Sequence, residues 1–189
     1  MSKLQVIIAS TRPGRQGPAV ARWFAEAAVR HGAFDVELID LAEVGLPLLD
    51  EPNHPRLRQY QHEHTRAWSE KVDSSDAFVF VTPEYNFGSA PALLNALDYL
   101  YEEWNYKPAG FVSYGGVSGG LRSVQMTKNV VTTLKMMPMV EAVTISFFSK
   151  FITGSGEFAA EEIHEKSASV MLTELTRWTD ALKPLRRAD

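Results

Sequence analysis

The sequence predicts an α/β fold: a three-layer sandwich in which helices cover both faces of a five-stranded parallel sheet. Two observations predict it. Short apolar runs alternate with longer segments whose apolar residues recur every three or four positions, from one end of the chain to the other. The composition, 45% hydrophobic and 22% charged over 189 residues, is that of an ordinary globular protein. Strands that alternate with helices imply βαβ crossovers and a parallel sheet covered on both sides.

The expected strands are short apolar runs that end at Gly, Pro, Ser or polar clusters. The run Leu4–Ala9, for example, stops at a loop rich in Gly, Pro and Arg. The run at 140–147 is rich in β-branched residues, which favour strands. The expected strands are Lys3–Ala9, Asp35–Asp40, Ala77–Thr82, Ala109–Tyr114 and Val140–Phe147.

The expected helices carry one apolar stripe each. In the first, Ala19, Trp23 and Ala27 repeat every four residues, and Gly32 follows as a typical C-cap. The other stripes are read in the same way from Leu, Val, Ile and Trp spacing. The expected helices are Pro18–His31, Leu57–Val72, Leu93–Tyr101, Leu121–Val131 and Ile163–Leu182.

A sheet of about five strands fits the flavodoxin-like order 2-1-3-4-5 more economically than a longer doubly wound sheet. The chain contains no internal repeat and no long linker, so we expect one flavodoxin-like domain over residues 1–189. In this architecture ligands bind beyond the carboxyl ends of the strands, where the strand order reverses. The loops that follow the first, third and fourth strands should therefore form the site.

Composition and charge exclude several function classes. The formal net charge of -4 argues against a nucleic-acid binder, because phosphate backbones require a basic surface. With no cysteine, the chain cannot form a disulfide framework, a thiolate zinc site or a cysteine nucleophile. Its apolar runs are far shorter than the roughly 18 residues that span a bilayer, and no signal-peptide pattern opens it. We expect a cytoplasmic protein without membrane, nucleic-acid or metal partners.

The loop after the first expected strand is typical of a phosphate site. It places Ser10, Arg12 and Arg15 just before a helix N-terminus, whose free N–H groups and partial positive charge favour an anion. Gly17 lets the backbone approach closely, and the arginines can pair with a dianion. Neither GxxxxGK[ST] nor GxGxxG is present, so the pattern favours a single phosphate monoester over a dinucleotide.

The other two loops are suited to a flat ring. Pro83-Glu84-Tyr85-Asn86-Phe87 follows the third strand, and we expect Tyr85 and Phe87 to be exposed beside amide groups, which can read the edge of a heterocycle. The loop at 115–120 carries four glycines in six positions and permits close approach of a ligand.

These segments together resemble the NADPH-dependent FMN reductase family. The resemblance is carried by Ser10-x-Arg12, by Pro83–Asn86 followed by Ser89 and Leu93–Asp98, and by Lys107–Ala109 leading into Ser113–Gly116 and Gly119-Gly120. The segments occur in the family's order and cover most of the chain from Leu4 to about Leu134.

The resemblance implies a flavodoxin-like fold, non-covalently bound FMN, NADPH or NADH as co-substrate, and a homodimer or homotetramer. It implies hydride transfer through the flavin to a quinone, free flavin, azo dye or similar small acceptor, with no side chain acting as a catalytic acid. The chain departs from the family pattern at Arg15–Pro18, where many relatives carry Ser and Asn, and Arg15 is expected to substitute. The residues implied to bind the cofactor are Ser10, Arg12, Arg15, Gly17, Pro83, Glu84, Tyr85, Asn86, Tyr114, Gly115 and Gly116.

Two other interpretations stay open at this point. A flavodoxin-like electron carrier would bind FMN without oxidising NAD(P)H, although such carriers tend to be more acidic than this chain. Alternatively, Gly116-Val117-Ser118-Gly119-Gly120 fits the G-x-S-x-G nucleophile elbow of serine hydrolases. The histidine that follows Ser118 is His164, which falls in an expected helix rather than in a loop after a strand.

Overall fold

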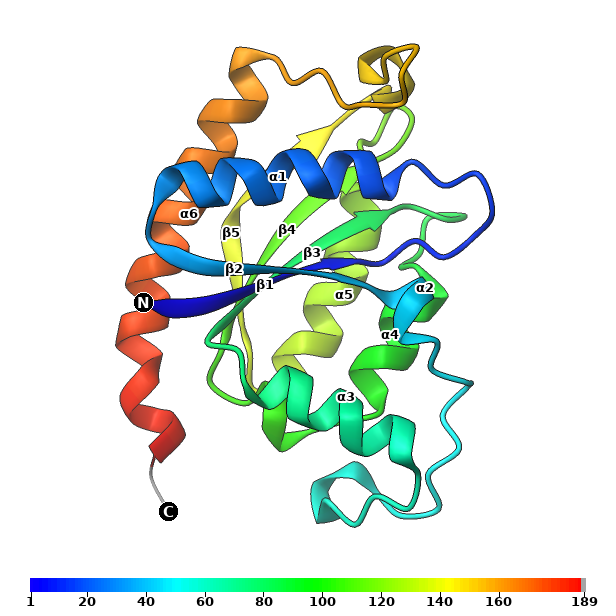
Figure 1. Ribbon diagram of the computed structural model, residues 1–189, viewed down its shortest axis with the longest axis vertical. Coiled ribbons are helices and arrows are strands. Elements are labelled where there is room, and N and C mark those ends of the chain that lie inside the picture. Colours follow the sequence, from blue (N-terminus) through cyan, green and yellow to red (C-terminus); the bar gives the residue numbers. More distant parts are fainter. Residues whose placement is uncertain (188–189) are drawn as a thin grey trace.

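The computed structural model describes residues 1–187 and contains a parallel sheet of the expected order, β2-β1-β3-β4-β5 (Figure 1). The strands of the sheet are β1 (Ser2–Ile8), β2 (Phe34–Asp40), β3 (Ala77–Pro83), β4 (Pro108–Tyr114) and β5 (Met137–Ile145). Every residue of β3 and β4 is buried, as expected for central strands covered on both faces. The edge strands β2 and β5 are partly exposed.

Helices cover both faces of the sheet and define two apolar cores (Figure 1). Phe24 of α1 and Leu172 of α6 belong to one core, while Trp68 of α3, Leu97 of α4 and Val131 of α5 belong to the other. The helices are α1 (Gly17–His31), α2 (Leu41–Val44), α3 (Glu63–Asp73), α4 (Pro91–Asp98), α5 (Leu121–Thr133) and α6 (Glu162–Leu182). Within residues 1–187, no helix is long and apolar enough to cross a membrane.

The strand register brings the carboxyl ends of the strands to one edge. Ile8 pairs with Val81, Pro83 pairs with Tyr114, and Tyr114 pairs with Ile145. The chain segments that follow β1, β3, β4 and β5 therefore leave the sheet at the same edge. The sequence predicted this for the segments after β1, β3 and β4, but not for the segment after β5.

The predicted helix over Leu57–Val72 is wrong in its first turn and a half. The structure has a short 3-10 helix at Pro55–Leu57, a break at Arg58, and then α3, which begins at Glu63. Arg58 has a φ of 50°, a left-handed conformation that ends helical hydrogen bonding. The neighbouring Leu57, the first residue of the expected helix, is exposed. The apolar positions at the start of the expected helix therefore do not form a buried face.

Other boundaries also differ from the sequence-based expectation, and the fifth strand begins at Met137 rather than Val140. The helix expected to reach Tyr101 ends at Asp98, and the fifth strand ends at Ile145 rather than Phe147. Phe147 has a φ of 51°, which turns the chain out of the sheet. This turn directs the segment after β5 toward the site edge.

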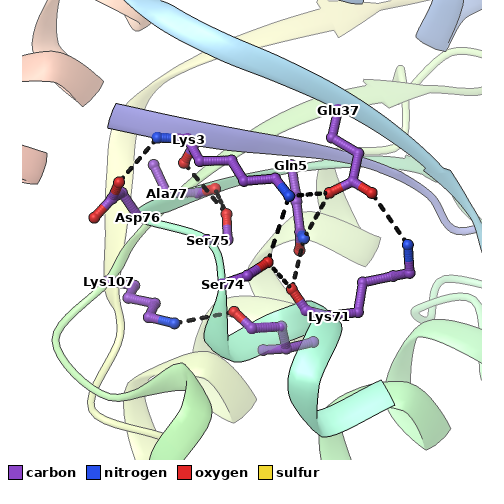
Figure 2. Close-up of polar contacts among 10 residues, drawn as sticks. Lys3, Gln5, Glu37, Lys71, Ser74, Ser75, Asp76, Ala77 and Lys107 are labelled. Atoms are coloured by element: carbon purple, nitrogen blue, oxygen red, sulfur yellow. Dashed lines mark hydrogen bonds and ion pairs between the residues drawn. The ribbon is translucent and has the colours of Figure 1, made fainter. Parts of the chain in front are cut away.

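A polar network ties the two strands at one side of the sheet to α3 (Figure 2). The carboxylate of Glu37 on β2 accepts bonds from Lys3 Nζ at 2.8 Å, Lys71 Nζ at 3.1 Å and Gln5 Nε2 at 3.1 Å. Gln5 also donates to the Lys71 carbonyl at 2.7 Å. Burial alone would raise the pKa of Glu37, but these donors outweigh it and hold the pKa at about 2.

Candidate functional site

A cavity of about 350 Å³ lies at the carboxyl edge of the sheet. It is formed by the segments that follow β1, β3, β4 and β5. Its lining residues are Arg12, Arg15, Gln16, Pro83, Glu84, Tyr85, Tyr114, Gly115, Gly116 and Phe148. The structure thus brings most of the predicted site residues around one hollow.

The N-terminus of α1 forms one end of the cavity. The helix begins at Gly17 with a proline in its first turn, no side chain caps it, and its first turn carries no acidic residue. Gln16, which precedes Gly17, lines the cavity and was not predicted. In this turn Pro18 has no N–H and the Ala19 N–H donates to the Gln16 carbonyl at 3.1 Å, so the helix start offers the Gly17 N–H and a partial positive charge.

Two buried hydroxyl groups converge beside Gly17. The side chains of Ser10 and Tyr114 are 1% and 4% exposed, and their hydroxyl oxygens have no hydrogen-bond partner among residues 1–187. A Cβ atom added to Gly17 would lie 2.3 Å from Ser10 Oγ and 2.6 Å from Tyr114 Oη, so a larger residue there would displace these hydroxyls. Burial raises the pKa of Tyr114, against a smaller opposing effect of the neighbouring Ser10 hydroxyl, and the protonated Tyr114 hydroxyl can donate. Unpartnered buried donors at a helix N-terminus are suited to an anion that completes them.

The two arginines of this segment differ in their surroundings. Arg15 donates through Nη1 and Nη2 to the Asp40 carboxylate at 2.5 and 2.6 Å, and through Nη1 to the Ser10 carbonyl at 2.6 Å. This bidentate pair raises the pKa of Arg15 and already balances its charge. Arg12 is exposed, and among residues 1–187 its side chain makes one long bond, to the Pro13 carbonyl at 3.4 Å. Arg12 is therefore the arginine that is free to meet a ligand.

The segment after β3 makes a tight turn that borders the cavity. Tyr85 and Gly88 exchange backbone bonds of 3.2 and 2.9 Å, and Asn86 and Phe87 between them have positive φ values of 50° and 67°. We expected both Tyr85 and Phe87 to be exposed. Phe87 is 70% exposed, but Tyr85 is half-buried and packs against the core. Asn86 is exposed and does not line the cavity.

The glycine-rich segment after β4 forms the opposite wall. Gly120 has a φ of 84°, and a Cβ there would lie 2.9 Å from the Tyr114 backbone nitrogen. Gly115 packs equally tightly, because its added Cβ would be 3.0 Å from the nitrogen of Gly120. The segment thus folds back on itself in a way that requires these glycines, and it presents the Gly115-Gly116 backbone to the cavity.

Phe148 is a cavity residue that sequence reasoning missed. It packs on Tyr114 with ring centroids 5.2 Å apart at 62°, and its backbone nitrogen donates to the Gly115 carbonyl at 3.2 Å. The segment after the fifth strand also leaves the carboxyl edge of the sheet, so the rule that identified the other loops applies here as well.

Ser118 does not sit in a catalytic triad. Its hydroxyl donates to Glu84 Oε2 at 2.9 Å. His164 lies in α6, where its ring packs on Phe151 and Phe158, and its Nδ1 accepts from the backbone nitrogen of Glu161. No histidine bonds to Ser118 within the described part of the chain, and the hydrolase interpretation is not supported.

A second cavity, of about 550 Å³, lies at the opposite edge of the sheet, before β3 and β4. Its polar groups largely satisfy one another: Lys107 Nζ donates to the carbonyls of Val72 and Asp73 at 3.0 Å, and Arg186 pairs with Asp76 at 2.8 Å. These contacts explain the buried Lys107 as a structural residue at the end of α3.

Comparison with known proteins agrees with this geometry. A family model described as NADPH-dependent FMN reductase matches residues 2–150. An NAD(P)H-dependent FMN reductase of Schizosaccharomyces pombe is 45% identical over 147 residues, covering 76% of this chain and 73% of that protein. An FMN-dependent NADPH-azoreductase of Staphylococcus saprophyticus is 30% identical over 119 residues, covering 62% of this chain and 61% of that protein.

Solved structures are similar in fold. FerB, a flavoenzyme NAD(P)H:(acceptor) oxidoreductase of Paracoccus denitrificans, superposes with a TM-score of 0.74 at 20% identity, covering 96% of this chain and 98% of that chain. A flavodoxin of Megasphaera elsdenii superposes with a TM-score of 0.55 at 12% identity, covering 90% and 98%. These two likenesses confirm the flavodoxin-like fold. The family model, which matches most of the chain, shows that this protein belongs to the NADPH-dependent FMN reductase family.

Proposed function

We propose that this protein is an FMN-dependent NAD(P)H oxidoreductase that passes hydride equivalents to a quinone, a free flavin, an azo dye or a similar small acceptor. One observation carries the proposal. The hydroxyls of Ser10 and Tyr114, which have no partner among residues 1–187, meet at the N-terminus of α1, at one end of a cavity whose other walls are Pro83–Tyr85, Gly115-Gly116 and Phe148. This combination suits a phosphate monoester joined to a flat heterocycle.

The residues present fit FMN at both of its ends. Ser10, Tyr114, Arg12 and the α1 N-terminus would hold the phosphate, because together they offer hydroxyl donors, a free guanidinium and the Gly17 N–H to a dianion. Arg15 would contribute mainly by fixing the loop, since its guanidinium is paired with Asp40.

The flat part of the cofactor would lie between the walls of the cavity. Pro83, Glu84 and Tyr85 would run along one side of the ring system, and Tyr114, Gly115 and Gly116 along another edge. Asn86, which we expected to join them, lies outside the cavity lining. The flavin, when bound, supplies the two-electron chemistry. The chain's own residues would bind and orient it, and Phe148 would exclude water from one side of the cavity.

The proposal includes no catalytic side chain. Glu84, the acidic residue of the cavity lining, illustrates why. Its carboxylate accepts hydrogen bonds from Ser118 and Arg122, so it is not free to exchange a proton with a ligand. NADPH or NADH would reach the exposed side of the ring, and the electron acceptor would follow it at the same place.

Assembly and location stay predictions. We expect a homodimer or homotetramer, and large exposed apolar side chains near the site, among them Phe87, Val117 and Leu121, are consistent with a subunit interface there. The expectation of one domain over residues 1–189 and of a cytoplasmic location is unchanged.

Spectroscopy of the purified protein tests the proposed function. After addition of FMN and desalting, the protein should retain visible flavin absorbance that anaerobic NADPH or NADH bleaches and a quinone restores. Retained flavin that neither nicotinamide bleaches would instead identify an electron carrier. Failure to retain flavin would contradict both functions.

A further inference from the structure

The Glu84 carboxylate joins the two walls of the cavity. It lies on the segment after β3, its side chain is 7% exposed, and its acceptors are occupied by groups from the segment after β4. Ser118 Oγ donates to it at 2.9 Å, the Arg122 backbone nitrogen at 3.0 Å and Arg122 Nη1 at 2.9 Å. Three charge-assisted bonds to one buried carboxylate form a strong link between segments that the sequence separates by 34 residues or more.

This link also caps a helix. The N-cap position of α5 is Gly120, which has no side chain to accept the free N–H groups of the first turn. Glu84 accepts one of them, the Arg122 N–H, and places a negative charge at the helix N-terminus, where the helix dipole favours it. Burial alone would raise the pKa of Glu84, but the Arg122 and Ser118 donors outweigh it and lower the pKa.

The link continues to the third wall of the cavity. Next to Ser118 in the same loop, the Gly116 carbonyl accepts from Phe147 at 2.8 Å, and the Gly115 carbonyl accepts from Phe148 at 3.2 Å. The loop after β4 is thus hydrogen-bonded to both other walls: to Glu84 through Ser118 and Arg122, and to the segment after β5 through the Gly115 and Gly116 carbonyls.

Arg122 also holds the far end of the turn that begins at Glu84. Its guanidinium lies 4.2 Å from the centroid of the exposed Phe87 ring. Asn86 and Phe87 both have positive φ, a conformation that persists in non-glycine residues only where surrounding contacts maintain it. Arg122 therefore contacts the turn at both of its ends.

We propose that Glu84, Ser118 and Arg122 form a positioning unit that fixes the distance between the Pro83–Tyr85 wall and the Gly115–Gly116 wall. The unit acts through those walls and sets how the flat ring and the incoming hydride donor face each other. The inference rests on the proposed function. It also gives Ser118 a role as a donor to Glu84 in place of the nucleophile that its motif suggested.

The test compares Glu84→Gln with Glu37→Gln. Glu37 is a matched control, because its carboxylate also accepts from three donor groups but lies in the network of Figure 2, away from the cavity lining. For each protein, stopped-flow spectroscopy gives the rate of flavin reduction at saturating NADPH, and fluorescence titration gives the Kd for FMN. Thermal melts report folding.

We expect the rate of flavin reduction to fall while the Kd for FMN stays nearly unchanged. Glu84→Gln should slow flavin reduction about tenfold, because a small misplacement of reacting groups is costly, while its Kd for FMN changes less than about threefold. Glu37→Gln should keep the wild-type rate. Arg122→Met should slow reduction, Arg122→Lys should restore part of the rate, and Glu84→Gln combined with Arg122→Met should be no slower than the slower single variant.

Three results would overturn the inference. A Glu84→Gln rate within twofold of the wild type would show that the link does not position the ring. A raised Kd with an unchanged rate at saturating FMN would assign Glu84 to binding alone. If Glu84→Gln does not fold, Ser118→Ala is tested in its place, because it removes one of the donors to Glu84. The inference then requires Ser118→Ala to reduce its flavin more slowly with little change in the Kd for FMN. A wild-type protein that binds FMN but is reduced by neither NADPH nor NADH would refute the proposed function, and this inference with it.

Discussion

Asp40 at the end of β2 holds the guanidinium of Arg15 in a bidentate pair of 2.5 and 2.6 Å. The pair lies at the edge of the cavity, and it changes what the sequence suggested for Arg15. An arginine beside a helix N-terminus is suited to binding a phosphate. When a carboxylate already neutralises its charge, the arginine contributes less to phosphate binding. The structure makes Arg15 the residue that ties the first loop to β2.

The first prediction separates the two arginines. Arg12→Met should raise the Kd for FMN about tenfold or more, since it removes a free charged donor. Arg15→Met should raise the Kd less than about threefold but lower the free energy of unfolding by roughly 1–2 kcal/mol, because it leaves Asp40 without its partner. Fluorescence titration and denaturant unfolding measure the two effects. Equal losses of FMN affinity would show that Arg15 also binds the phosphate.

The second prediction concerns Gly17. Gly17→Ala places a Cβ 2.3 Å from Ser10 Oγ and 2.6 Å from Tyr114 Oη, so these hydroxyls must move. Overpacking of this kind costs about 1–3 kcal/mol, and displaced donors should weaken FMN binding as well. Gly14→Ala is the control in the same loop, since nothing lies within 4 Å of its added Cβ. The positive φ of Gly14 adds backbone strain to this variant, but its added methyl group does not displace the hydroxyls. An unchanged FMN affinity in Gly17→Ala would contradict the proposal that Ser10 and Tyr114 bind the phosphate beside Gly17.

The third prediction concerns the buried hydroxyls. Tyr114→Phe keeps the ring that packs on Phe148 and removes the oxygen that lacks a partner. It should raise the Kd for FMN about tenfold, the value of a hydrogen bond to a charged group, without loss of thermal stability. Ser10→Ala should behave in the same way. Calorimetric titration with FMN measures both, and a stability loss without an affinity loss would assign the hydroxyls to folding.

The fourth prediction is a pH dependence of stability that arises at Glu37. Its pKa is about 2 in the folded protein against an ordinary value of 4.5, so the folded state binds its proton less readily than the unfolded state does. The stability that Glu37 contributes is therefore present above pH 4.5 and is lost as the pH falls toward 2. Glu37→Gln should be less stable by about 1 kcal/mol at pH 7, because the pair is partly exposed, and should approach the wild type near pH 2. Denaturant melts across this range check it, and a constant difference would contradict it.

Most of the fold could be predicted because it depends on local patterns. The buried runs at Leu4–Ile8 and Ala77–Val81 and the stripe through Trp23 and Ala27 are visible in the sequence, and the alternation of strands and helices fixes the parallel topology. The break at Arg58 could not be predicted, because a left-handed residue without glycine leaves no sequence signal.

The place of the cavity could be predicted from the strand ends, but contacts between side chains of different segments could not. Ser10 and Gly17 follow β1 and Tyr114 ends β4, so the topology alone brings them to the same edge. Asp40 could not be linked to Arg15, because the two meet only once β2 lies beside β1. Ser118 illustrates the same limit: its motif is local, but its partner Glu84 comes from another loop.

Comparison of FMN with riboflavin tests the central claim most directly, because the two ligands share the ring and differ in the phosphate. The wild type should bind FMN at least about 100-fold more tightly, since an anion would complete both buried hydroxyls and the α1 N-terminus. Tyr114→Phe should lower FMN affinity and leave riboflavin affinity unchanged. Equal affinity of the wild type for FMN and riboflavin would show that this end of the cavity does not hold a phosphate, and would contradict the account.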